Sequence, residues 1–149
     1  MSDISRYLNT SVSDAKISLE GGLRNDAPST GRDALALLEA LQGREGQTSR
    51  RKVAASVLRK AAKTLVESEE LDKHGVAAGD YYAEIPTGEL REWVQMTVED
   101  DPAKAAREML ATLTGLRGEH GTASRRKILA AGVGKAAKAL TEEATLCTG

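Results

Sequence analysis

Two copies of the segment Ser-Arg-Arg-Lys, at residues 49–52 and 124–127, have the clearest potential for chemistry, because each lies where a predicted helix begins, with Arg-Arg-Lys in its first turn. A helix N-terminus carries about half a positive charge, so cations placed there cost roughly 0.3–1 kcal/mol each. A bound anion reverses this preference, because free backbone N–H groups and basic side chains then converge on it. The sequence therefore predicts anion binding at both helix starts, with phosphate as the natural ligand.

Five basic positions recur at a spacing of 75 residues, and they are the candidate binding residues. In the first copy they are Arg50, Arg51, Lys52, Lys60 and Lys63. In the second copy they are Arg125, Arg126, Lys127, Lys135 and Lys138. At about 100° per residue, the lysines lie opposite the apolar side of each helix. Arg59 shares that side, but its counterpart is Gly134.

The net charge of −1 conceals a strong segregation along the chain. The windows 44–63 and 117–138 contain 13 of the 21 basic residues but only 2 of the 22 acidic residues. This pattern indicates two basic segments in an otherwise acidic protein.

Three functional interpretations remain open for these basic segments. In the first, they bind nucleic acid mainly through its phosphates, because no side chain in the sequence stands out as one that reads the bases. Stacking on bases is poorly provided for, because Tyr81, Tyr82 and Trp93 are the only candidate platforms, and we expect each to pack in the core or linker. In the second, the chain is an adaptor or inhibitor that binds an acidic protein or self-associates as a homo-oligomer. In the third, the charges form an ordinary solvated surface.

An enzyme is the class that the sequence supports least, and we predict no catalytic residue, metal site or cofactor. The segment 132–135, Gly-Val-Gly-Lys, lacks the spacing and the trailing Ser or Thr of a phosphate-binding loop. Two His and one Cys cannot form a zinc site of the usual kind. His74 and His120 are expected in exposed linker or turn positions, without a partner that suggests a nucleophile or base.

The second copy also reveals an internal repeat that sets the predicted architecture. Residues 49–67 and 124–142 share 11 identities in 19 aligned positions. We interpret the repeat as a duplication and predict an all-α fold with two tandem, pseudo-symmetric three-helix units, packed as one bundle-like domain. The first unit covers residues 1–70, a linker covers 71–87, and the second unit covers 88–149.

Apolar spacing and capping residues predict the individual helices. The first helix covers residues 3–24, and the second begins at Thr30, which forms a capping box variant with Asp33. The third begins at Thr48 or Ser49 and ends near residue 70. The linker contains a short extended piece at 81–85. The second unit repeats the order with helices from Thr87 or Gly88, from Pro102 after the capping Asp101, and through 128–140.

The composition limits what kind of molecule this is. The chain contains no Phe, so the core must be built from Leu, Val, Ile and Ala. No run approaches 18 apolar residues and no apolar leader precedes the first predicted helix, so we expect no membrane contact. A single Cys suits a reducing compartment, and we predict a cytoplasmic location. At Gly132, on the buried side of the last helix, we expect the close approach of another helix.

Overall fold

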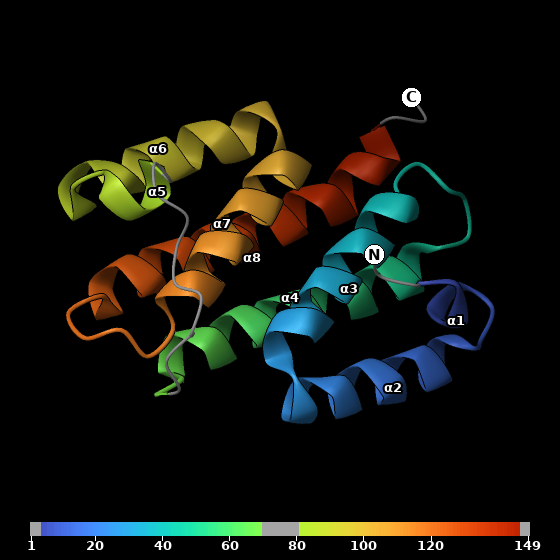
Figure 1. The fold of residues 1–149 in the computed structure, drawn as a ribbon. Coiled ribbons are helices and arrows are strands. Elements are labelled where there is room, and N and C mark those ends of the chain that lie inside the picture. Colours follow the sequence, from blue (N-terminus) through green and yellow to red (C-terminus); the bar gives the residue numbers. More distant parts are fainter. Residues whose placement is uncertain (1–3, 70–80, 147–149) are drawn as a thin grey trace.

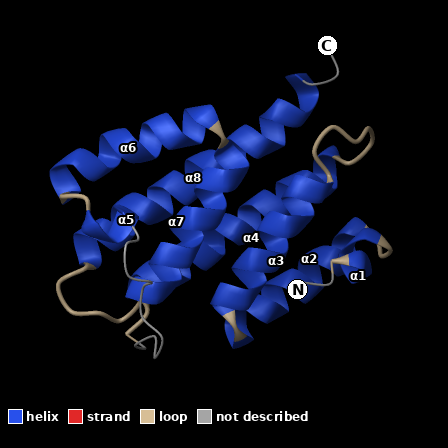
Figure 2. Ribbon diagram, turned by 45° about the horizontal axis from the view of Figure 1, so that its top comes forward, coloured by secondary structure: helices blue, strands red, loops and turns tan. Residues whose placement is uncertain are grey.

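The computed structural model describes residues 4–69 and 81–146, and every regular element in these ranges is an α-helix (Figures 1 and 2). The helices are α1 (Ser5–Leu8), α2 (Val12–Asn25), α3 (Ala27–Ala40), α4 (Thr48–Glu67), α5 (Tyr81–Glu84), α6 (Thr87–Asp100), α7 (Pro102–Leu116) and α8 (Ala123–Leu146). The all-α prediction is confirmed for this part of the chain.

The helices pack around one central antiparallel pair, α4 and α8 (Figure 1). Helix α2 flanks α4, and helix α6 flanks α8. Helices α3 and α7 contact each other and lie across one side of the central pair. The described residues share a single core of Leu and Ala with a few Val, Tyr and Met side chains, so the bundle forms one compact domain.

Helix starts and turns recur at the spacing of the sequence repeat. Helices α6, α7 and α8 begin 75 residues after α2, α3 and α4, respectively. The side chains of Asp26 and Asp101 accept hydrogen bonds from the backbone N–H groups of Ser29 and Lys104, and each cap precedes a helix with Pro in its first turn.

The loops before α4 and α8 depend on glycine at matching positions. Gly43 and Gly118 have φ of 77° and 72°, and Gly46 and Gly121 have φ of 74° and 81°. Residues that carry a Cβ atom rarely adopt this left-handed backbone conformation, so glycine is favoured at both turns of each loop. We call residues 4–69 the first half and residues 81–146 the second half.

Two predicted helix boundaries are wrong. The predicted helix 3–24 is divided into α1 and α2, because the Ser11 side chain accepts from the Asp14 N–H and starts a new helix. Helix α3 begins at Ala27 rather than Thr30, because the Asp26 cap precedes Pro28, which fits a first helical turn.

The expected extended piece at 81–85 is also wrong, because residues 81–84 form the short helix α5. Each half therefore contains a short helix followed by three long ones, instead of three helices alone. Most of the predicted linker, residues 71–80, lies outside the described residues. Helices from Thr87 and Pro102 are confirmed, as is the cap at Asp101.

Gly132 confirms the expected close approach of helices. A Cβ atom at this position would lie 2.4 Å from Val94 Cγ1 of α6 and 2.6 Å from Met109 Sδ of α7. Both distances are shorter than a van der Waals contact, so a larger residue would force the neighbours apart. Among the helices of the described residues, none is both long and apolar enough to cross a bilayer.

Candidate anion-binding face

Arg51 lies in the first turn of α4 but does not face outward. Arg51 is only 5% exposed, and its Nη1 donates to the carbonyl oxygens of Leu41 at 3.1 Å and Arg44 at 2.8 Å. Leu41 is the C-cap of α3, where unpaired carbonyls create a partial negative charge. The protein itself therefore supplies the negative end that the first turn of α4 needs.

Arg126 occupies the same position in α8 and is 8% exposed, yet it has different partners. Its Nη1 donates to Val66 at 2.7 Å and to Ser68 at 3.4 Å, both at the C-terminal end of α4. The carbonyls of Leu116 and Glu119, which correspond to those that Arg51 binds, lie 3.3 and 2.7 Å from the Thr122 hydroxyl. Arg126 thus connects the second half to the first.

Arg50 and Arg125 are half-buried and hold the two short helices. Arg50 Nη1 donates to the carbonyl oxygen of Tyr7 in α1, and Arg125 Nη1 donates to that of Tyr82 in α5 at 2.8 Å. Both tyrosines are buried. These contacts attach each short helix to the first turn of a long one.

The expectation that the helix-start arginines aim outward is therefore wrong for Arg51 and Arg126, which are buried. Arg50 and Arg125 each donate a hydrogen bond from a guanidinium nitrogen to a backbone carbonyl. In all four cases carbonyl oxygens accept the hydrogen bonds, so the unfavourable charge at the helix start is offset inside the fold.

The recurring lysines are all exposed, as the helical spacing predicts. Together with the exposed Arg59 they form what we call the basic face, which consists of Lys52, Arg59, Lys60, Lys63, Lys127, Lys135 and Lys138. Within the described residues, the only ion pair that involves this face joins Lys60 Nζ to Glu20 Oε1 at 3.5 Å. The other six cations of the face have no carboxylate partner in this part of the chain.

Arg59 joins the two helices of the basic face. The position that a Cβ would take at Gly134 lies 3.6 Å from Arg59 Cδ and 3.7 Å from Cγ. The arginine stem therefore crosses from α4 onto α8, where the repeat places glycine opposite it. The repeat itself gave no reason to select Arg59, because its counterpart is not basic.

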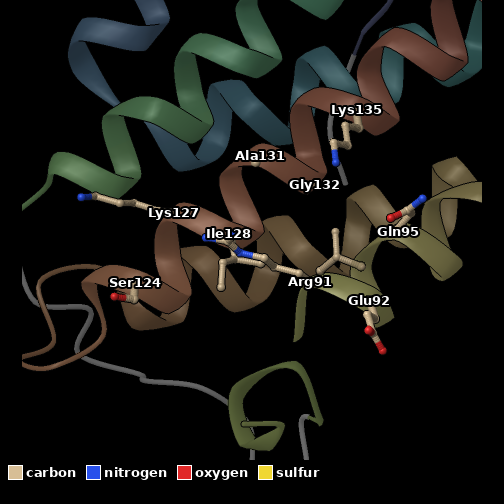
Figure 3. Close-up of a pocket in the computed structure, with 10 residues that line it drawn as sticks. Arg91, Glu92, Gln95, Ser124, Lys127, Ile128, Ala131, Gly132 and Lys135 are labelled. Atoms are coloured by element: carbon tan, nitrogen blue, oxygen red, sulfur yellow. The ribbon is translucent and has the colours of Figure 1, made fainter. Parts of the chain in front are cut away.

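A groove of about 440 Å³ lies beside this face, between α6 and α8 (Figure 3). Helix α6 contributes Arg91, Glu92, Val94 and Gln95. Helix α8 contributes Lys127 and Lys135 at the rim, with Ile128, Ala131 and Gly132 between them. The groove thus combines three cations and one carboxylate with an apolar floor. Sequence reasoning missed Arg91, because only the packing of α6 on α8 brings it to these lysines.

The aromatic residues divide into buried and exposed positions. Tyr82 is buried in the core, as predicted, whereas the expectation of packing for Trp93 is wrong because that residue is 45% exposed on α6. His120 is exposed in the turn before α8, as predicted. In residues 4–69 and 81–146, no group of three or more His, Cys, Asp or Glu is arranged to hold a metal ion.

Comparison with known proteins adds no assignment to this geometry. No protein-family model, curated protein or solved structure gives a significant match to the chain.

Proposed function

We propose that the protein binds nucleic acid through phosphate contacts made by the basic face of α4 and α8. The carrying observation is that all six recurring lysines and Arg59 are exposed, and only Lys60 has a carboxylate partner in the part of the chain that the structure describes. Clustered cations release condensed counterions when they neutralise phosphates, and this release drives binding.

The arrangement of the face supports an extended polyanion as the ligand. Helices α4 and α8 pack against each other, and the Arg59 side chain of α4 lies against Gly134 of α8, so the basic sides of the two helices adjoin there. Lysine contacts phosphates as a flexible point charge, which suits recognition of the backbone rather than of the base sequence. Binding is therefore non-enzymatic and weakly dependent on sequence.

The experiment that tests this function neutralises the lysines and leaves the buried arginines intact. The quadruple variant carries Lys52→Gln, Lys63→Gln, Lys127→Gln and Lys138→Gln. We expect its affinity for a 20-base-pair duplex to fall at least 100-fold, with a smaller dependence on salt, because about four phosphate contacts are lost. Fluorescence anisotropy at several salt concentrations measures both quantities.

A matched control removes four exposed cations outside the basic face, through Arg24→Gln, Arg32→Gln, Arg44→Gln and Lys104→Gln. It has the same net charge as the first variant. The proposal expects the control to keep most of the wild-type affinity. Equal losses in the two variants would show that net charge alone matters, and an unchanged affinity in the first variant would exclude the basic face.

One observation favours the alternative of charge-complementary self-association or an acidic protein partner. Helix α6 exposes four carboxylates, from Glu89, Glu92, Glu99 and Asp100, against a single cation, Arg91. An acidic helix of one molecule could pair with the basic face of another. Sedimentation velocity at low salt tests this alternative, which predicts a concentration-dependent mass that Glu89→Gln with Glu99→Gln reduces.

We also propose that the two halves are pseudo-symmetric copies that arose by duplication. Support comes from the shared spacing of 75 residues in helix starts, aspartate caps and left-handed glycines. A cleft of about 380 Å³ between α3 and α7 is lined by corresponding pairs, among them Leu35 with Leu110 and Ala36 with Ala111. An experimental structure tests the proposal, which expects α2–α4 to superpose on α6–α8.

A further inference from the structure

We infer that the groove between α6 and α8 binds one nucleotide unit, with its phosphate on Arg91 and Lys135 and its sugar or base against the apolar floor. The inference goes beyond the binding of a polyanion to the basic face, because it assigns a ligand of defined size to one open groove between two helices. The groove volume of about 440 Å³ falls within the range of about 300–1,000 Å³ that small-molecule sites occupy.

The charges of the groove favour an anionic ligand. Arg91, Lys127 and Lys135 are exposed, and none takes part in an ion pair within the described residues. In Figure 3, Arg91 extends across the groove towards Ile128, whereas Glu92 points away from it. A guanidinium and an ammonium on opposite helices can bind the same phosphate from two sides.

The floor of the groove favours an organic ligand over a simple ion. Val94, Ile128, Ala131 and Gly132 line it between the charged residues. Inorganic phosphate would satisfy the cations but leave this apolar surface in water. The sugar and base of a nucleotide would cover it, while Gln95 and Ser124 offer hydrogen-bonding groups at the edge.

The corresponding positions in the first half explain why only one such groove is inferred. Lys16 and Lys60 correspond to Arg91 and Lys135, but Glu20 takes the place of Gln95 and forms an ion pair with Lys60 at 3.5 Å. In addition, Val57 stands where Gly132 lies in the second half. The first half therefore has a neutralised lysine and a bulkier floor.

A free nucleotide and a nucleotide within a single strand present the same chemistry to the groove. The experiment therefore compares adenosine 5′-monophosphate, inorganic phosphate and a six-nucleotide single strand. Binding is followed by ¹⁵N NMR of the full chain, using the amide signals of Gly132 and Gly134. We expect the nucleotide to bind at least tenfold tighter than inorganic phosphate and to shift the Gly132 signal.

Gln95→Glu is the most direct variant, because it copies Glu20 of the first half with little change in shape. We expect it to weaken nucleotide binding at least fivefold, and Arg91→Gln to weaken it about tenfold. Lys16→Gln, at the position corresponding to Arg91, should leave the affinity unchanged.

The possible outcomes separate this inference from the proposed function. A shift of the Gly132 signal by the strand alone would support the inference with a strand as the source, and a shift by the free nucleotide would support it with a small molecule. Binding of the strand to the basic face without any change at Gly132 would overturn the inference while leaving the proposed function in place. Measurable but equal affinities for nucleotide and inorganic phosphate, or an unaffected Gln95→Glu variant, would also overturn it.

Discussion

The two halves of the molecule solve the same problem at a helix C-terminus in different ways. In the first half, the Arg51 guanidinium binds the carbonyls of Leu41 and Arg44 at the end of α3 and in the loop that follows. In the second half, the Thr122 hydroxyl donates to the corresponding carbonyl oxygens of Leu116 and Glu119. Arg126 is thereby left to bind Val66 and Ser68 at the end of α4.

This difference shows that residues repeated in sequence need not have repeated roles. Both arginines cap the C-terminal end of a helix, but one acts within its half and the other acts between halves. The two loops differ at Thr122, whose counterpart Gln47 instead accepts a hydrogen bond from Arg50. The loop with Gln47 is joined by a local arginine cap, and the loop with Thr122 accompanies an arginine that connects the two halves.

The largest expected effect is that of removing the buried guanidinium groups. Arg51→Met and Arg126→Met should each lower the free energy of unfolding by about 2–4 kcal/mol, because charged hydrogen bonds to buried or part-buried carbonyls are lost. Urea denaturation measures the loss. Hydrogen exchange then locates it, with faster exchange expected at the end of α3 for Arg51→Met and at the end of α4 for Arg126→Met.

Arg125→Met provides the control for that pair, because the same charge is removed from a half-buried position with one carbonyl partner. It should cost about 1 kcal/mol. The distinction between the halves would fail if Arg126→Met accelerated exchange at the end of α7 rather than α4.

Positions 57 and 132 correspond in the two halves, and changing the size of either residue should destabilise the protein. The reasons are opposite, because one variant removes volume and the other adds it. Val57→Ala removes buried methyl groups and should cost about 1–2.5 kcal/mol. Gly132→Ala adds a methyl group close to Val94 and Met109 and should cost about 1–3 kcal/mol. Thermal denaturation monitored by circular dichroism measures both changes.

Gly134→Ala is a matched control for Gly132→Ala, since its Cβ would meet the Arg59 side chain at ordinary contact distances. It should raise stability by about 0.5–1 kcal/mol through helix propensity alone. A Gly132→Ala variant with unchanged stability would contradict the close approach of α6 and α7 to α8.

Thr122→Val tests the hydroxyl that sets the two halves apart. The variant keeps the side-chain shape but loses the contacts to Leu116, Glu119 and Arg126, and we expect a cost of about 1–2 kcal/mol. Thr48→Val in the first half loses one contact to Arg51 at an exposed residue and should cost less than about 0.5 kcal/mol. Equal costs in urea denaturation would remove the special role of Thr122.

The smallest expected effect concerns the ion pair that distinguishes the two flanking helices. Glu20→Gln makes the first half resemble the second and should lower stability by about 0.5 kcal/mol or less, because Lys60 and Glu20 are partly exposed. The loss should disappear in 1 M salt, where charges are screened within about 3 Å. A loss that persisted at high salt would indicate a contribution from packing rather than charge.

Much of the helical structure could be predicted from local sequence signals. The Asp-Pro pair at 101–102 marks a helix boundary through capping and a fixed φ, and both effects act within one turn. At the earlier boundary the same cap occurs with one residue between Asp26 and Pro28, and the prediction placed the helix start at Thr30 instead. Local signals therefore identified the helix but not its first residue.

The candidate site was predicted less completely. Helical spacing correctly separated the exposed lysines from the apolar side of α4 and α8. The same spacing could not show that Arg51 and Arg126 are buried, because the carbonyl partners of Arg51 depend on the path of the preceding loop and those of Arg126 lie in the other half of the chain. Arg91 was missed for the same reason, since no local signal links α6 to α8.

The sequence by itself determined which segments form helices, which side of each is apolar and where lysines gather, because these properties depend on neighbours within one or two turns. The tertiary structure alone decided which cations are buried and which are exposed, because that outcome depends on which helix end each arginine meets, across one loop for Arg51 and between the halves for Arg126. The arginines that reach backbone carbonyls at helix ends are buried or half-buried, whereas the lysines of the basic face are exposed.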